Sequence, residues 1–130
     1  MGGTVQPLER VVESALYVDD LARSWRFYVD VLGAEVLLDS ARLLALNIGG
    51  ASVLLLFQRG ATSEPLSTPG GVVPPHGAVG IQHVAFAVAD TAALASWARR
   101  LNHHGTTSRA VCSGNEAERA FTCATRTAFD

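Results

Sequence analysis

An internal repeat constrains the fold of this chain more than any other sequence feature. Residues 13–20 (ESALYVDD) and residues 83–90 (HVAFAVAD) each form an alternating apolar segment that runs into aspartate and then into a helical pattern. Each helical pattern carries one tryptophan, Trp25 or Trp97, eight residues before a glycine. Alternation predicts a strand with one buried face, and repetition of a strand–helix unit predicts two copies of one module.

The first copy predicts a β-α-β-β-β module within residues 1–58. Its first strand leads into Asp19 and Asp20, either of which can accept the free backbone N–H groups of a first helical turn. The helix then carries apolar residues at helical spacing and ends at Gly33, where a left-handed turn favours glycine. The Gly49-Gly50 pair predicts a hairpin between the last two strands. The predicted strands cover residues 11–18, 34–38, 43–48 and 52–57.

A segment rich in proline and glycine, residues 59–80, follows the first module. Because neither helices nor strands tolerate so many breakers, we interpret it as a linker, and its length leaves open a lid or a dimer arm. The second copy begins within residues 81–106, with a predicted strand at 81–88 and a helix at 91–104. Three further strands should follow, but residues 107–130 lack the alternation that predicts them.

The two periodicities also predict which side chains face the core. Alternate strand residues and one stripe of each helix should be largely buried where helix and sheet meet. These residues are Leu16, Val18, Leu21, Trp25, Val29, Leu32, Val84, Phe86, Val88 and Trp97.

Composition excludes several classes of function. The chain has 130 residues, enough for one domain with a real core, and its net charge of −2 gives no electrostatic footprint for nucleic acid. The apolar run Val53–Phe57 is too short to cross a membrane, and the N-terminal residues do not have the pattern of a secretory signal. We therefore expect a cytoplasmic protein. Two cysteines, Cys112 and Cys123, make neither a disulfide framework nor a zinc spacing.

Three sequence segments resemble the vicinal oxygen chelate superfamily, which includes glyoxalase I, extradiol dioxygenases and bleomycin-resistance proteins. They are residues 15–21 (ALYVDDL), residues 26–33 (RFYVDVLG) and residues 83–86 (HVAF). The resemblance implies an α+β fold of paired βαβββ modules, a small-molecule ligand with vicinal oxygens, and a homodimer. The net charge and the short apolar runs described above predict no nucleic-acid partner and no membrane partner.

Glu13 and His83 occupy the same place in the two copies, each five residues before a matching valine. The resemblance implies that both are ligands of a divalent metal (Fe, Mn, Ni or Zn), and that Glu13 is also catalytic, as a proton shuttle. Oxygen and imidazole ligands suit these metals. Tyr17 and Ala85 lie on the same strand faces and are implied as substrate-binding residues. The function implied is a metal-dependent enzyme of glyoxalase or dioxygenase type.

Alternative functions remain open because the ligand set is incomplete. The resemblance implies that a member like glyoxalase I takes a further carboxylate from the fourth strand of a module, and Val53–Phe57 contains none. A metal-free binding protein of the bleomycin-resistance type is therefore the alternative, and an inactive chain is a third. His76 could reach the site as a mobile base, but we interpret it as a solvated loop histidine.

The tail departs from the family pattern, and a frameshift explains the departure. Suitable synonymous codons for residues 113–128, read one frame over, give WERGGASLYVRDPDG. That string matches the ending that the family resemblance implies, a strand followed by an Asp-Pro-Asp-Gly turn. We infer a change of frame between Gly105 and Arg109, and we expect the tail to pack poorly or out of register.

Overall fold

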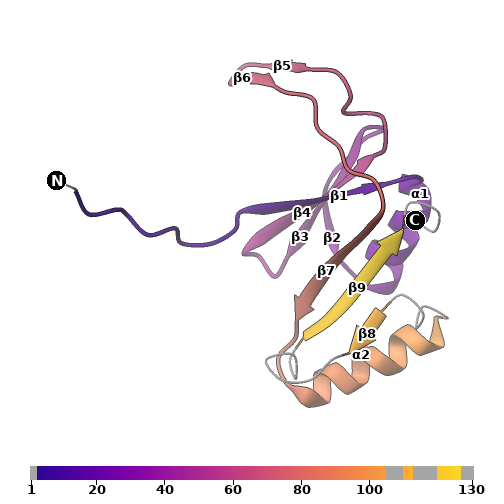
Figure 1. The fold of residues 1–130 in the computed structure, drawn as a ribbon. Coiled ribbons are helices and arrows are strands. Elements are labelled where there is room, and N and C mark those ends of the chain that lie inside the picture. Colours follow the sequence, from indigo (N-terminus) through magenta and orange to yellow (C-terminus); the bar gives the residue numbers. More distant parts are fainter. Residues whose placement is uncertain (1–2, 105–109, 113–119, 127–130) are drawn as a thin grey trace.

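The computed structural model describes residues 3–104, 110–112 and 120–126, and it arranges the strands of these segments in three sheets (Figure 1). In the four-stranded sheet, β1 is parallel to its neighbour, and the other neighbours are antiparallel. The order across this sheet is β1 (Glu13–Val18), β4 (Ser52–Gln58), β3 (Leu43–Ile48) and β2 (Glu35–Asp39). The first predicted module is therefore present, with its strand boundaries within two residues of those expected.

The first helix begins as predicted but changes its pitch. Asp20 caps α1 (Leu21–Trp25), because its Oδ1 accepts hydrogen bonds from the backbone N–H groups of Ala22 and Arg23 at 2.9 and 3.2 Å. The chain continues as a π-helix, η1 (Arg26–Val31), where we expected a regular α-helix. The π-helical segment covers only six residues, which is too short for the spacing of apolar residues to reveal the wider turn.

The main core lies between this helix and the four-stranded sheet. Leu16 and Val18 are buried as predicted, and the other eight predicted core residues are half-buried. All of them pack against one of the two core clusters, so the predicted faces are correct. The burial of Trp25 was overestimated, because a helix lying on a sheet leaves its flanking side chains partly in solvent.

The second module begins with β7 (Ile81–Ala87) and α2 (Thr91–His103), whose first turn Asp90 caps through a 2.8 Å bond from Ala93 N to its Oδ1. The short strand β8 (Ala110–Cys112) and the longer strand β9 (Ala120–Arg126) follow, and the order across this sheet is β7-β9-β8. The lack of alternation in the tail therefore did not reveal these two strands. An unpaired strand edge offers backbone groups to any nearby extended segment, whatever its side-chain pattern.

The three-stranded sheet of the second module differs from the four-stranded sheet of the first module in the direction of one strand. β9 runs antiparallel to β7, whereas β4 runs parallel to β1 in the equivalent place. The second module is thus altered after its helix. Most of the inferred frameshift region, including residues 105–109 and 113–119, lies outside the described residues, so the frameshift stays a prediction.

The linker is more structured than expected. It contains a short hairpin of β5 (Leu66–Thr68) and β6 (Gly71–Val73), so the expectation of neither helix nor strand was wrong. Pro69 and Gly70 form its turn, and the Oγ1 of Thr68 donates to the backbone oxygen of Gly71 at 2.7 Å. The hairpin projects from the body of the molecule above β1 and β4 (Figure 1).

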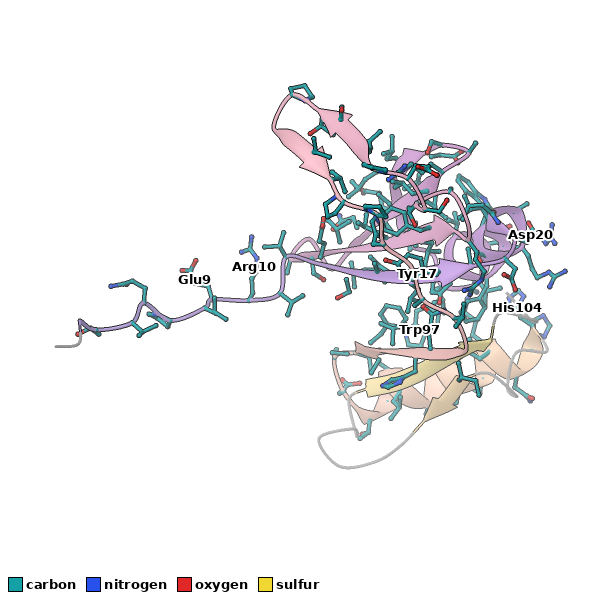
Figure 2. The ribbon with its side chains drawn as sticks, turned by 45° about the horizontal axis from the view of Figure 1, so that its top comes forward. Glu9, Arg10, Tyr17, Asp20, Trp97 and His104 are labelled. Atoms are coloured by element: carbon teal, nitrogen blue, oxygen red, sulfur yellow. The ribbon has the colours of Figure 1, made fainter. Side chains whose placement is uncertain are left out.

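Residues 3–12 form an extended, exposed arm that leads away from β1 (Figure 2). The first strand accordingly begins at Glu13 and not at residue 11. In the part of the chain that is described, no helix has the length and apolar character needed to span a membrane.

Candidate functional site

A cavity of about 410 Å³ lies over the face of β1 that points away from the helix. Alternation along β1 puts Glu13, Ala15 and Tyr17 on this face, and the parallel register pairs them with Val53, Leu55 and Phe57 of β4. The hairpin contributes Leu66 and Val73 to the opposite wall. The lining residues are Glu13, Ser14, Ala15, Tyr17, Arg42, Leu43, Leu55, Phe57, Leu66, Val73 and His76.

Three rings form one wall of this cavity. Tyr17 and Phe57 are neighbours in the β1–β4 register and stack with centroids 5.6 Å apart. His76 meets Phe57 edge-on at 4.7 Å, and a hydrogen bond of 2.6 Å joins its Nδ1 to the Tyr17 hydroxyl. Offset and edge-on contacts are the favoured arrangements of aromatic rings. The wall is therefore already assembled without a ligand.

His76 is held in place by its backbone. Its N–H donates to the carbonyl oxygen of Thr62 at 3.0 Å, and the Thr62 hydroxyl donates to the carbonyl oxygen of His76. Thr62 is itself only 2% exposed. Our interpretation of His76 as a solvated loop residue was therefore wrong. The signal that could have found it is the Pro74-Pro75 pair, which restricts the backbone directly before it.

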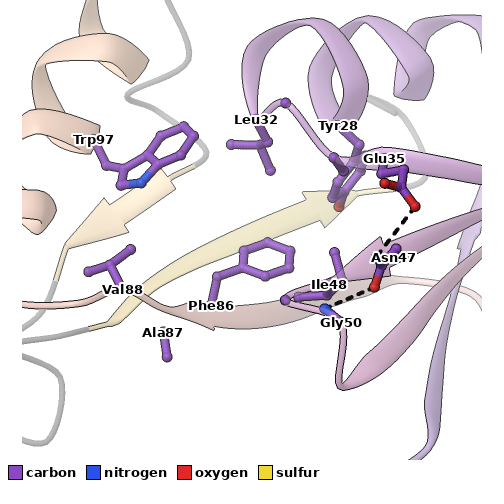
Figure 3. Close-up of a pocket in the computed structure, with 13 residues that line it drawn as sticks. Tyr28, Leu32, Glu35, Asn47, Ile48, Gly50, Phe86, Ala87, Val88 and Trp97 are labelled. Atoms are coloured by element: carbon purple, nitrogen blue, oxygen red, sulfur yellow. Dashed lines mark hydrogen bonds between the residues drawn. The ribbon is translucent and has the colours of Figure 1, made fainter.

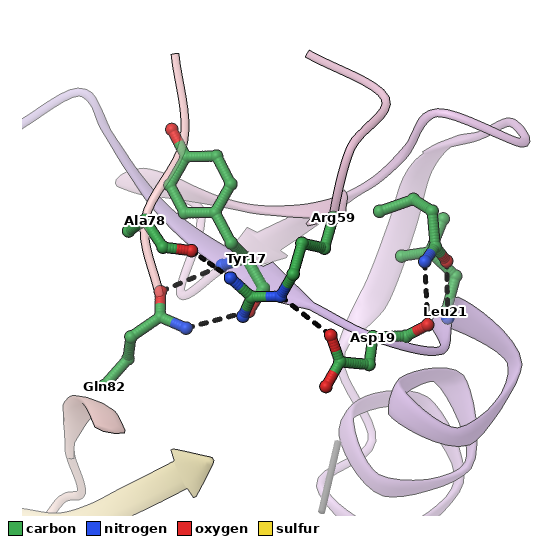
Figure 4. Close-up of polar contacts among 7 residues, drawn as sticks. Tyr17, Asp19, Leu21, Arg59, Ala78 and Gln82 are labelled. Atoms are coloured by element: carbon green, nitrogen blue, oxygen red, sulfur yellow. Dashed lines mark hydrogen bonds and ion pairs between the residues drawn. The ribbon is translucent and has the colours of Figure 1, made fainter. Parts of the chain in front are cut away.

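A polar clamp fixes the linker to the end of β1 (Figure 4). The Arg59 guanidinium binds Asp19 Oδ1 at 2.7 Å and the carbonyl oxygen of Tyr17 at 3.1 Å, and it also donates to the carbonyl oxygen of Ala78. From the start of β7, Gln82 donates to the carbonyl oxygen of Tyr17 at 2.8 Å and accepts from its N–H at 3.0 Å. Both ends of the linker are thus attached beside Tyr17.

The structure brings together only some of the predicted site residues. Glu13 and Tyr17 line the cavity, whereas His83 and Ala85 lie on the exposed face of β7 and are not part of its lining. No hydrogen bond or ion pair is found between the carboxylate of Glu13 and the imidazole of His83, both of which are described. The metal-ligand roles of Glu13 and His83 therefore stay predictions.

The donor chemistry bears on whether a metal fits. A catalytic metal needs about three protein ligands and an open position. Among the described residues, no group of three or more histidine, cysteine, aspartate or glutamate side chains could hold a metal ion. The described donor set therefore does not fit a catalytic metal by itself.

A separate inter-module cavity, of about 330 Å³, lies on the other side of the sheet, between the two modules (Figure 3). Its walls are largely apolar, with Leu32 on one side and Phe86 and Trp97 on the other. Asn47 joins its polar edge, accepting from the Gly50 N–H at 3.0 Å and donating to Glu35 at 3.4 Å. None of the predicted site residues lines it.

Comparison with known proteins identifies the family. Residues 10–115 match the model of the Glyoxalase/Bleomycin resistance protein/Dioxygenase superfamily, and the chain belongs to this superfamily. It has the glyoxalase-type α+β fold of paired modules, with the second module altered. A search of curated proteins found no match.

Two solved structures illustrate the similarity. A lactoylglutathione lyase from Agrobacterium tumefaciens is 34% identical with a TM-score of 0.69, over 77% of this chain and 73% of that one. An integron cassette protein from the mobile metagenome of the Halifax Harbour sewage outfall is 25% identical with a TM-score of 0.52, over 75% and 72% of the two chains.

Proposed function

We propose that this chain binds a small, largely apolar aromatic molecule in the cavity between β1, β4 and the linker hairpin. The observation that carries this proposal is the preformed wall of Tyr17, Phe57 and His76 in a cavity of about 410 Å³. Small-molecule sites are typically preformed, mostly apolar and within this range of volume. In this respect the chain would act as the bleomycin-resistance branch of its family does, by sequestering a ligand.

Different lining residues would contact the apolar and the polar parts of the ligand. A ligand ring would pack against the half-buried ring of Tyr17, while Leu55 and Leu66 would cover the apolar surface of the ligand. The carboxylate of Glu13 and the guanidinium of Arg42 would orient polar groups of the ligand. Because Arg42 already donates to the carbonyl oxygen of Ala61 at 3.1 Å, it is held in place before a ligand arrives.

A pair of hairpin variants tests this proposal. Leu66 lines the cavity, whereas Val72 lies on the same hairpin outside the lining and is 66% exposed. Leu66→Arg should abolish binding of phenylalkanols and similar aromatic probes, measured by isothermal titration calorimetry, and Val72→Arg should not. Equal binding by both variants, or no binding by the wild-type protein, would contradict the proposal.

A second candidate is a metal-dependent lyase or dioxygenase acting on vicinal oxygens. It is favoured by the 34% identity to a lactoylglutathione lyase and by the position of Glu13 in the cavity wall. The metal would be Fe, Mn, Ni or Zn, with Glu13 and His83 as ligands. This function needs at least one further ligand from outside the described residues or from a second chain.

Metal analysis separates the two candidates. The wild-type protein, loaded with each metal and dialysed, should retain about one metal per site only if the second candidate holds. Glu13→Gln and His83→Ala should then both lose the metal and any activity on lactoylglutathione, while His103→Ala should keep both. Retention of the metal by Glu13→Gln and His83→Ala would exclude these residues as ligands.

We also propose that the chain forms a homodimer, as its family resemblance implies. Light scattering coupled to size-exclusion chromatography would give its mass in solution. A monomer at all concentrations tested would contradict this proposal and would also remove a second chain as the source of a missing ligand.

A further inference from the structure

Two cavities meet at Tyr17 and His76. The first is the proposed binding site of about 410 Å³, and the second, of about 370 Å³, lies against the inner side of the linker. Within the described part of the chain, Tyr17 and His76 are the lining residues that the two cavities share. The second cavity is otherwise lined by Arg59, Gly60, Thr62, Ser63, Gly77, Ala78 and Val79.

The hydrogen bond between Tyr17 and His76 spans the boundary between the two cavities. Its length of 2.6 Å leaves no room for a ligand to pass between the phenol oxygen and the imidazole. The edge-on contact of His76 with Phe57 holds the imidazole from another side. This hydrogen bond joins two side chains, so a substitution of either residue can remove it.

We propose that the Tyr17–His76 pair is the partition that limits the length of ligand accepted by this protein, and that the second cavity is a subsite for an alkyl tail. This inference rests on the proposed binding function. It assigns a specificity role to His76, a linker residue that lies far in sequence from Tyr17 and β1.

The chemistry of the second cavity favours an alkyl tail because its polar side chains are already engaged. The Arg59 guanidinium binds Asp19 and the carbonyl oxygens of Tyr17 and Ala78. The Thr62 hydroxyl donates to the carbonyl oxygen of His76, and the Ser63 hydroxyl donates to that of Gly60 at 3.0 Å. What remains for a ligand is mostly the carbon surface of glycine, alanine and valine residues.

The partition can be removed without releasing the linker. The contacts between His76 and Thr62 use only backbone atoms of His76, so His76→Ala keeps them while deleting the imidazole. Tyr17→Phe keeps the ring against Phe57 and deletes only the hydroxyl. His104→Ala, at the exposed end of α2, is the matched control for loss of a histidine.

The experiment measures the affinity of a phenylalkanol series with progressively longer alkyl chains by isothermal titration calorimetry. In the wild-type protein, affinity should stop rising once the chain reaches the partition. In His76→Ala, it should keep rising by about fourfold per added methylene, the increment for burying one such group. Tyr17→Phe should move the length limit in the same direction by a smaller amount, and His104→Ala should not move it.

The outcomes separate this inference from the proposed function. A length limit in His76→Ala equal to that of the wild-type protein, with short members still bound, would overturn the partition alone. Binding of no member by either protein would overturn the proposed function and the partition with it. A crystal structure of His76→Ala with a long member bound should place the alkyl chain beside Ala78 and Gly60.

Discussion

Gln82 completes the hydrogen bonding of Tyr17 as a neighbouring strand would. Its side-chain amide accepts from the backbone N–H of Tyr17 at 3.0 Å and donates to the carbonyl oxygen at 2.8 Å. One side chain from the second module thus satisfies both backbone groups of a residue in the first module. This contact also fixes the backbone of the residue whose ring forms the cavity wall.

Gln82→Ala should lower the free energy of unfolding by about 1–3 kcal/mol, because it leaves the partly buried N–H of Tyr17 without its protein partner, while the carbonyl oxygen of Tyr17 still accepts from Arg59. Urea unfolding followed by circular dichroism would measure the change. Gln6→Ala, in the exposed N-terminal arm, is the control and should have no effect. A loss for Gln82→Ala no larger than the control would show that water replaces the amide fully.

Leu46→Ala should cost about 2–5 kcal/mol, the range for removing a large aliphatic side chain from a core. Leu46 on β3 is 0% exposed, whereas Leu38 on the neighbouring strand β2 is 52% exposed. Leu38→Ala should therefore cost much less in the same urea titration. Similar losses for both variants would contradict the assignment of Leu46 to the core and of Leu38 to the exposed surface.

Asp20→Ala should cost about 0.5–2 kcal/mol, since the carboxylate caps two backbone N–H groups of α1. Asp20→Asn keeps an acceptor oxygen and should lose less. Asp39→Ala, at an exposed strand end, is the control for removing one negative charge. Thermal unfolding of the four proteins would rank them, and an Asp20→Ala variant as stable as Asp39→Ala would argue against the cap.

A frame-corrected chain should be more stable than this one and should bind more metal. Restoring the alternate frame from Gly105 onward would supply the strand and turn that the family resemblance implies, with a carboxylate expected on the strand that follows. Differential scanning fluorimetry and elemental analysis of both purified proteins would measure the two quantities. Equal melting temperatures and equal metal contents would indicate that the tail is a native ending and that the frameshift is wrong.

Local patterns predicted the strands and the module order well. Leu43–Ile48 was predicted at its observed boundaries because it combines an apolar run with the Gly49-Gly50 turn that ends it. The face of β1 that carries Glu13 and Tyr17 followed from alternation alone. These features depend on residues that are close in sequence. The alternation of apolar and polar residues and the turn residues reveal the geometry of such segments.

The candidate site depends on contacts between residues far apart in sequence, which the spacing of apolar residues does not predict. The Tyr17–His76 bond joins residues 59 positions apart, and it forms because the linker folds back and is clamped by Arg59. A loop histidine in isolation carries no sign of such a partner. The strands of the tail escaped prediction for a related reason, since β9 pairs with β7 and β8 pairs with β9, and no alternation of their own predicted them.

The direction of β9 has a practical consequence for anyone attaching a label to this protein. β4 finishes beside Val18, but β9 runs against β7, so Arg126 finishes opposite Ile81. Ile81 precedes the glutamine that contacts Tyr17, which places the end of β9 on the side of the molecule where the cavity wall is anchored. Fluorophores and affinity handles for binding measurements are therefore better placed on the N-terminal arm, whose far end projects into open solvent (Figures 1 and 2).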